Sequence, residues 1–232
     1  MKVRKIMKLN KFVSSKARPL PVIIMADISG SMSINGKIEA LNQSIQDMIS
    51  SFATESRMRA EIHLSIVTFG KNVQEHIKLA PAHQVSIDQP LVAEGTTPLG
   101  EACRLVKELL EDKEMIPSRA YRPVVVLASD GYPTDDYQAA FNDLIQSERG
   151  QKATRLALAI GNDADEELLS AFNNDLEAPL FYAHNASEIG RFFRAVTMSV
   201  AAHSQSQSPN QRMTLSLNSI DSVDDEDFEL PL

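Results

Sequence analysis

The order of apolar and polar positions along the chain predicts short strands that alternate with helices. Apolar runs rich in β-branched residues, or apolar residues at every second position, predict strands at 21–26, 61–70, 122–129, 153–160 and 180–183. Apolar residues at helical spacing predict helices at 38–52, 99–112, 135–149, 165–174 and 187–202. The segment Gly70-Lys71-Asn72 predicts a hairpin turn into a further strand at 73–80.

Strands that alternate with helices are typical of a mostly parallel sheet that is covered on both faces. The pattern therefore predicts an α/β fold with a doubly wound, mostly parallel six-stranded sheet in the order 3-2-1-4-5-6. The hairpin adds one antiparallel edge strand, and the helices are expected on both faces of the sheet.

Charge divides the chain into three regions. The net charge is −8, yet residues 1–18 contain seven Lys or Arg and no acid, whereas residues 203–232 contain six acids and one Arg. We expect a basic arm at 1–18, one folded domain at 19–202 and a disordered acidic tail at 203–232. The acidic body argues against nonspecific nucleic-acid binding, which depends on a basic surface.

Two further features concern the location of the protein. No apolar stretch approaches the roughly 20 residues that span a bilayer, and the basic opening segment lacks the apolar region of a signal peptide. Cys103 is the only cysteine, so no intramolecular disulfide is expected. The sequence therefore predicts a protein of the reducing cytoplasm without a membrane span.

Oxygen-bearing side chains gather in three loops that adjoin predicted strands or helices. Asp27, Ser29 and Ser31 directly follow the first strand, Thr97 directly precedes a helix, and Asp130 follows the strand at 122–129. In a doubly wound sheet, ligands bind at the carboxyl ends of strands where the strand order reverses. Strands 1 and 4 are neighbours at that point, so we expect the two carboxylates to approach within roughly one strand spacing, about 5 Å.

Two carboxylates so close together repel each other unless a cation lies between them. Carboxylates, neutral hydroxyls and waters form an all-oxygen ligand set, which suits Mg²⁺ or Mn²⁺ better than zinc. An ion in such a site is undercompensated and open to solvent, so an Asp or Glu from another protein can complete its coordination. We expect Gly30 and Gly131 to let the two loops turn tightly.

The motifs DISGSM, GTTPLGEA and VVVLASDG together resemble the metal-ion-dependent adhesion site of von Willebrand factor A (VWA) domains, over about residues 20–202. The resemblance implies that Ser29, Ser31 and Thr97 ligate the metal directly. It also implies that Asp27 and Asp130 act directly or through water. The family usually has a glycine where this chain has Thr96, so Thr96 stays open as an alternative to Thr97.

A narrower likeness lies in RPLPVIIMADISGSM and RPVVVLASDGYPTDD, which resemble stand-alone bacterial TerY-type VWA proteins of tellurium-resistance clusters. This likeness implies a metal-dependent protein-interaction module in a stress-response or signalling system. It also implies partners that include a kinase and a phosphatase encoded nearby. The expected partner presents an Asp or Glu carboxylate, and the chain itself is expected not to be an enzyme.

Simpler interpretations of the motifs stay open. Ser29 and Ser31 are also typical helix caps, and Asp130-Gly131 is also a typical turn. Thr134 fits either a cap of the following helix or the rim of a partner-binding face.

Two other functions also stay open. One is a phosphoester- or nucleotide-hydrolysing enzyme that uses the same metal site. However, the segment GSMSINGK has five residues between its glycines, and a phosphate-binding loop has four. Lys37, the nearest candidate base, is expected to face solvent. The other is a scaffold that binds its partners without metal.

Overall fold

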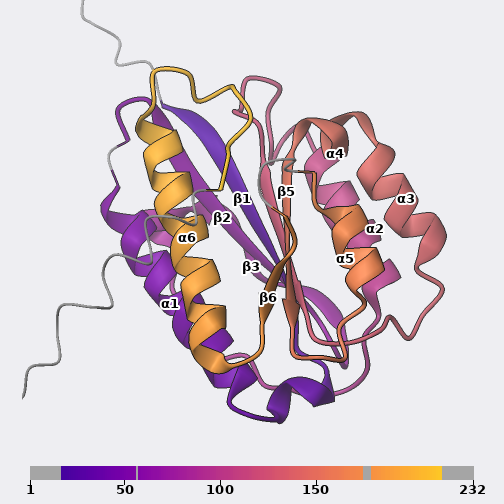
Figure 1. The fold of residues 1–232 in the computed structure, drawn as a ribbon. Helices are drawn as coiled ribbons and strands as arrows, with labels where there is room; N and C mark the ends of the chain where they lie inside the picture. The colour runs from indigo at the N-terminus through magenta and orange to yellow at the C-terminus, as the bar shows by residue number, and fades with distance from the viewer. Residues whose placement is uncertain (1–16, 56, 175–178, 216–232) are drawn as a thin grey trace, which may run out of the picture.

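The computed structural model describes residues 17–55, 57–174 and 179–215 (Figure 1). The strands are β1 (Arg18–Asp27), β2 (Ala60–Phe69), β3 (Val73–Pro81), β4 (Val124–Ser129), β5 (Thr154–Ile160) and β6 (Phe181–Ala183). The α-helices are α1 (Lys37–Thr54), α2 (Leu99–Glu111), α3 (Gln138–Gln146), α4 (Glu148–Lys152), α5 (Glu166–Phe172) and α6 (Ala186–Gln205). Two short 3-10 helices are η1 (Gly30–Ser33) and η2 (Ala82–Gln84).

The six strands form one sheet in the order β3-β2-β1-β4-β5-β6. All neighbouring strands are parallel except β2 and β3, which form an antiparallel hairpin at one edge. The strand order, the antiparallel edge and the helices around the sheet confirm the predicted fold. Because the order reverses between β1 and β4, the loops after these two strands lie beside each other.

The sheet has an apolar core on each face. Along β1, Val22 and Ile24 belong to one core and Ile23 and Met25 to the other, as the two-residue period of a strand requires. Helices α1 and α6 cover the first face, and α2, α3, α4 and α5 lie on the second (Figure 1). A strand buried on both faces has no solvent-exposed side, so its sequence is a continuous apolar run.

The helix predicted at 135–149 is wrong at both of its ends. The helix α3 begins only at Gln138, because the carboxylate of Asp135 accepts hydrogen bonds from the backbone N–H groups of Gly100 and Glu101, at 3.0 Å each. Asp135 therefore caps α2 instead of starting its own helix. At the other end Ser147 interrupts the helix, and its hydroxyl accepts a bond from Gly150 at 3.0 Å, which starts α4.

The expected boundary at residue 202 falls inside α6, which continues to Gln205. Beyond the helix, Met213 and Leu215 are buried in the same core that α1 and α6 cover. The chain thus packs against the domain to at least Leu215. Only residues 17 and 18 of the predicted basic arm are among the described residues. The predicted tail beyond residue 215 also lies outside them.

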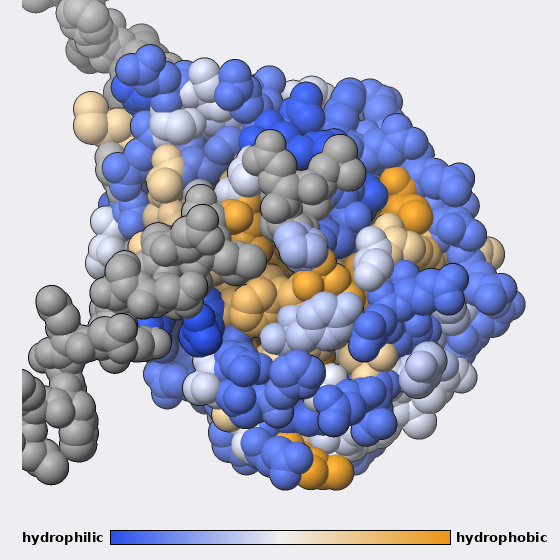
Figure 2. Space-filling model, viewed as in Figure 1, coloured by the Kyte–Doolittle hydropathy of each residue, from blue (hydrophilic) through white to orange (hydrophobic). Residues whose placement is uncertain are grey.

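No helix in the described ranges is long and apolar enough to cross a membrane. Figure 2 shows that apolar residues gather in the middle of the face that carries β6, with hydrophilic residues around them. The short β6 pairs with only the last part of β5, so the sheet is narrow at this edge.

Candidate metal site

The carboxyl ends of β1 and β4 bring the first and third loops together. Ala26 and Ala128 are register partners in the sheet, which places the ends of the two strands side by side. The Ser129 hydroxyl donates to Asp27 Oδ2 at 2.6 Å, and the Ser29 backbone N–H donates to Asp27 Oδ1 at 2.8 Å. Asp27 is fully buried and holds both loops by these two bonds.

A chain of hydroxyls leads from Asp27's loop to Asp130. The Ser29 and Ser31 hydroxyl oxygens lie 3.0 Å apart, and the Ser31 hydroxyl donates to Asp130 Oδ1 at 2.7 Å. Ser29 and Asp130 are buried, whereas Ser31 is exposed. Neither serine side chain caps η1, so the simple capping interpretation is wrong. The cluster is therefore polar in its interior and opens to solvent at Ser31.

The second loop brings Thr97, and not Thr96, to the same cluster. Thr97 is buried, and a Cβ added to Gly131 would lie 3.9 Å from the Thr97 hydroxyl oxygen. Thr134 fixes this loop, because its hydroxyl accepts from the Thr97 N–H at 3.0 Å and its own N–H donates to the Thr97 carbonyl at 2.9 Å. Thr96 is exposed. The position of Thr97 makes it the better candidate ligand.

Lys37 is the main correction to the predicted site. The sequence suggested that it faces solvent, but its ammonium donates to Asp130 Oδ2 at 2.6 Å. Its side chain is only 15% exposed and that of Asp130 is fully buried. Asp130 therefore accepts a hydroxyl bond on one oxygen and an ammonium bond on the other.

Burial strongly affects the first carboxylate of the cluster. The pKa of Asp27 rises from its ordinary 3.8 to about 6, mainly because burial disfavours the charged form. Hydrogen bonds from Ser129 and Ser29 oppose the rise, and repulsion from Asp130 adds to it. Ionisation of Asp27 is therefore less favourable than ionisation of an exposed carboxylate, and a nearby positive charge would favour the ionised form.

The glycines that shape the loops differ from those expected. A Cβ added to Gly30 or Gly131 would meet only ordinary van der Waals contacts. The close approach occurs instead at Gly95, whose φ is +88° and whose added Cβ would lie 2.4 Å from the Lys71 backbone nitrogen. Gly95 also accepts a hydrogen bond from the Gly30 N–H at 3.0 Å. A side chain at residue 95 would therefore push the second loop away from the Gly70–Lys71 turn and disturb its hydrogen bond with Gly30.

Sequence reasoning did not assign the contacts of four residues that build the site. Ser129 orients Asp27, Lys37 pairs with Asp130, Thr134 holds the Thr97 loop and Asp135 caps the helix that follows it. Ser129 and Thr134 stand next to the motifs in the sequence. Lys37 begins α1 after the loop, and its direction depends on packing that no local pattern shows.

The donors at this site suit a hard cation. Within the described residues no group of three or more His, Cys, Asp or Glu side chains could hold a metal, so a site rich in nitrogen or sulfur is absent from that part of the chain. Two carboxylates and the hydroxyls of Ser29, Ser31 and Thr97 remain, and such oxygens fit Mg²⁺ or Mn²⁺. The residues thus fit the ion that the sequence predicted.

A hollow of about 380 Å³ adjoins the cluster. It runs from Ser31, Lys37 and Asp130 to the ends of β5 and β6, where Asn162 and His184 line it. The His184 Nδ1 lies 3.2 Å from the Asn162 side-chain oxygen. The open side of the candidate site is therefore concave and large enough for a few side chains of a partner.

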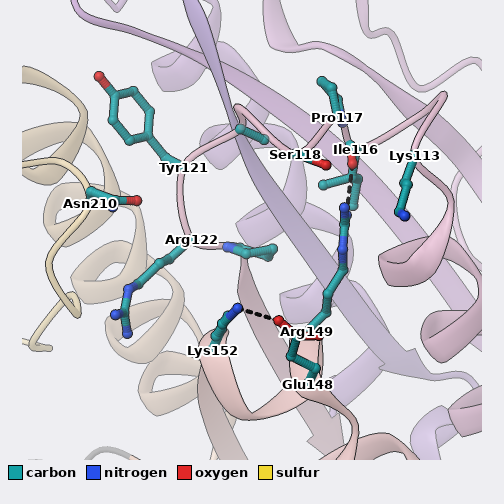
Figure 3. A pocket seen from close by; sticks show the side chains of 12 residues that line it. Lys113, Ile116, Pro117, Ser118, Tyr121, Arg122, Glu148, Arg149, Lys152 and Asn210 are labelled. Carbon is teal, nitrogen blue, oxygen red and sulfur yellow. Dashed lines mark hydrogen bonds and ion pairs between the residues drawn. The ribbon is translucent and has the colours of Figure 1, made fainter.

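A second hollow, of about 450 Å³, lies at the amino-terminal end of β4 (Figure 3). There the Arg149 guanidinium donates to the backbone carbonyls of Leu110 and Ile116 at 2.8 and 2.7 Å. Lys152 pairs with Glu148 at 2.5 Å. Both cations bind groups of the chain itself, and Arg149 ties the carboxyl end of α2 to the segment that follows it.

The fold and the position of the polar loops define a class of domain with a sheet of this order and oxygen donors at its switch point. The model of the von Willebrand factor type A domain matches residues 22–195, and the chain belongs to this family. None of the curated proteins compared with the chain matches it.

Solved structures share the fold at low identity. A von Willebrand factor type A protein from Catenulispora acidiphila is 20% identical with a TM-score of 0.61, over 79% of this chain and 42% of that one. Proximal thread matrix protein 1 from the mussel byssus, with a zinc-occupied MIDAS motif, is 15% identical with a TM-score of 0.62, over 78% and 48%. Manganese-loaded TRAP protein from Plasmodium vivax is 21% identical with a TM-score of 0.53, over 75% and 72%. The matched region spans less than half of the first two proteins.

Proposed function

We propose that this chain is a metal-dependent protein-interaction module that binds an acidic side chain of a partner through Mg²⁺ or Mn²⁺. The observation that carries the proposal is the cluster of two buried carboxylates, Asp27 and Asp130, with neutral hydroxyls around them and an opening at Ser31. Within the described residues, the Lys37 ammonium pairs with Asp130 and balances one of the two negative charges. A divalent ion supplies the missing positive charge.

The chain's own residues have separate roles in this proposal. Ser29, Ser31 and Thr97 offer hydroxyl oxygens to the ion, and Asp27 and Asp130 compensate its charge directly or through water. The bound ion supplies an electrophilic position that a carboxylate can fill. Because Ser31 is the exposed ligand, the partner approaches from its side, over the adjoining hollow.

The charge of the chain makes this interaction depend on metal. The net charge is −8 and the site itself is acidic, so an acidic partner group is repelled when no ion is present. Two of the solved structures described above carry a metal by their own descriptions, zinc in the mussel protein and manganese in the Plasmodium protein. These two structures support the proposal that a domain of this fold can bind a divalent metal. That the metal of this chain is Mg²⁺ or Mn²⁺ is part of the proposal.

An enzyme that uses the same ion would need a general base beside it. The Lys37 ammonium is paired with Asp130 and offers no lone pair in that contact. His184 lines the adjoining hollow, and one of its ring nitrogens contacts Asn162. A hydrolysis assay with nucleotides and phosphoesters tests this alternative, and an activity that Asp130→Ala abolishes would replace the interaction function.

The cellular setting is part of the proposal as well. The likeness of the segments around Asp27 and Asp130 to TerY-type proteins supports a cytoplasmic stress-response system of tellurium-resistance type. In such a system the partner is a kinase or phosphatase of the same gene cluster, and the part of it that binds presents an Asp or Glu.

The proposal is tested by a pull-down from host extract with Mg²⁺, and again with EDTA. We expect a partner that is retained with Mg²⁺ and lost with EDTA, and that Ser31→Ala also loses. The same partner, once purified, should bind at least tenfold more weakly in EDTA, because the site then faces it with its carboxylates alone. Equal binding with and without EDTA would contradict the metal mechanism.

A further inference from the structure

One cation of the chain itself is built into the candidate metal site. The Lys37 ammonium lies 2.6 Å from Asp130 Oδ2, while Asp130 Oδ1 accepts from Ser31. The Asp130 side chain is fully buried and that of Lys37 is 15% exposed. Because the pair is buried, salt screens it poorly, and the positive charge of Lys37 acts on any ion that binds beside it.

The fold positions this lysine from two sides. Helix α1 begins at Lys37, directly after Gly36, which adopts a left-handed conformation with a φ of +71°. From the end of β5, Gly161 leaves room for the side chain, since a Cβ there would lie 3.3 Å from the Lys37 nitrogen. Lys37 is therefore held at the site and is not a long side chain that met Asp130 by chance on an open surface.

The charge of the site follows from this contact. Asp27 and Asp130 alone would give a charge that a divalent ion cancels. With Lys37 included, the metal-free cluster carries one net negative charge, and the metal-loaded cluster carries one net positive charge. Like charges repel, so the lysine opposes entry of the metal, and the same charge attracts an anion to the loaded site.

We propose that Lys37 is a positioning residue that weakens the binding of the metal and strengthens the binding of a partner carboxylate to the metal-loaded site. This inference rests on the proposed function, since it concerns the same ion and the same partner group. Its signature is two effects of opposite sign. A lysine that only stabilised the fold would change both affinities in the same direction or neither.

The experiment uses the full chain and three variants. Lys37→Met removes the charge and keeps the length of the side chain, and Lys37→Gln removes the charge and keeps a hydrogen-bond donor. Lys71→Met is the matched control, because Lys71 lies against the Gly95 loop but is 62% exposed and pairs with the exposed Glu94. Calorimetry measures Mn²⁺ affinity, and acetate serves as the carboxylate probe, detected by its displacement of Mn²⁺-bound water in proton relaxation.

We expect Mn²⁺ to bind both Lys37 variants about tenfold more tightly, and acetate to bind their loaded sites several-fold more weakly. Lys71→Met should match the wild type in both, because an exposed ion pair is screened. If the wild type binds Mn²⁺ but Lys37→Met and Lys37→Gln bind it equally or more weakly, the role of Lys37 is wrong while the proposed function stands. If the wild type and all variants fail to bind Mn²⁺, the proposed function is wrong, and this inference with it.

Discussion

Strands β1 and β4 carry opposite charges at their two ends, and the two ends differ in whether the chain satisfies those charges. Arg18 begins β1 and Arg122 lies two residues before β4, whereas Asp27 ends β1 and Asp130 follows β4. Arg122 lines the hollow of Figure 3, and Asp27 and Asp130 belong to the candidate metal site.

At the basic end, arginine donors meet acceptors of the chain itself. The Arg18 Nε donates to the Arg119 carbonyl at 2.5 Å, and its guanidinium lies 4.0 Å from the centre of the Tyr121 ring. Arg149 reaches two more carbonyls. Carbonyl acceptors and an aromatic ring stabilise the positive charge of a guanidinium that is also partly solvated. Such a guanidinium needs no bound counter-ion.

At the acidic end the partners are hydroxyls, and the charge is not balanced. Ser29, Ser31 and Ser129 orient the carboxylates, but a hydroxyl bond does not cancel a buried negative charge. Lys37 balances only one of the two. The comparison teaches that hydrogen bonding and charge compensation are separate requirements. At the acidic end the hydrogen bonds are made but the charge is not compensated, and this is where a bound cation is expected.

The largest effect should come from Asp27→Asn, which removes one charge and keeps the shape of the side chain. We expect Mn²⁺ affinity to fall by about a hundredfold, the upper end of the roughly 10–100-fold loss seen when a group that orients a metal ligand is removed, because this change also removes a charge. The metal-free variant should melt no lower than the wild type, because the variant removes a buried charge whose desolvation raises the pKa of Asp27. Calorimetry and thermal melts in EDTA measure the two effects.

The outcome that contradicts this prediction is an Asp27→Asn variant that binds Mn²⁺ as the wild type does. Arg122→Gln is the matched control at the opposite end of the strands, and it should leave Mn²⁺ affinity unchanged.

The opposite end should respond in stability and not in metal binding. Arg149→Met leaves the carbonyls of Leu110 and Ile116 without their donor, at a cost of about 2 kcal/mol in the free energy of unfolding. Mn²⁺ affinity should stay unchanged. Urea unfolding and Mn²⁺ titration measure the pair of effects, and a loss of metal affinity in this variant would show that the two ends are not independent.

Lowering the pH should weaken metal binding through Asp27 at the acidic end. The pKa of Asp27 is raised from 3.8 to about 6, so protons compete with the metal below about pH 6. In that range Mn²⁺ affinity should fall by up to about tenfold per pH unit. Without metal, in EDTA, the stability of the fold should depend on pH in the opposite direction. The folded chain binds the Asp27 proton more tightly than the unfolded chain does. The contribution of Asp27 to the free energy of unfolding therefore falls as pH rises from about 4 to about 6. A flat Mn²⁺ affinity between pH 7 and pH 5 would contradict this.

The smallest effect should distinguish the two threonines of the second loop. The hydroxyl of the buried Thr97 lies near Gly131, whereas Thr96 is exposed. Thr97→Val keeps the volume and removes one neutral ligand, so Mn²⁺ affinity should fall several-fold, which is below the roughly 10–100-fold loss typical of groups that orient a metal ligand. Thr96→Val should have no effect. The reverse order would assign the ligand role to Thr96.

The fold could be predicted from the sequence because its strands are buried on both faces. A run such as Val124–Ser129 cannot alternate, and its length and branched residues distinguish it from a helix. The break at Ser147 could not be predicted in the same way. It arises because the Ser147 hydroxyl accepts a hydrogen bond from the Gly150 backbone N–H. The late start of α3 was equally hidden, because Asp135 caps a helix that lies 35 residues earlier in the chain.

The candidate site could be predicted where a loop follows a strand directly. Asp27 and Asp130 have their positions set by the ends of β1 and β4, and the structure brings both to one cluster. Lys37 could not be placed, because its direction depends on Gly161, more than 120 residues away in the sequence. The ligand roles of the predicted residues stay predictions.

Binding of Mn²⁺ to the wild-type chain at neutral pH, measured by equilibrium dialysis, tests the central claim most directly. The account predicts one ion per chain at saturation, competition by Mg²⁺ and complete release by EDTA. Failure to bind Mn²⁺ at millimolar concentration, by a chain whose circular dichroism shows the α/β fold, would contradict the claim that the acidic end of β1 and β4 is a metal site.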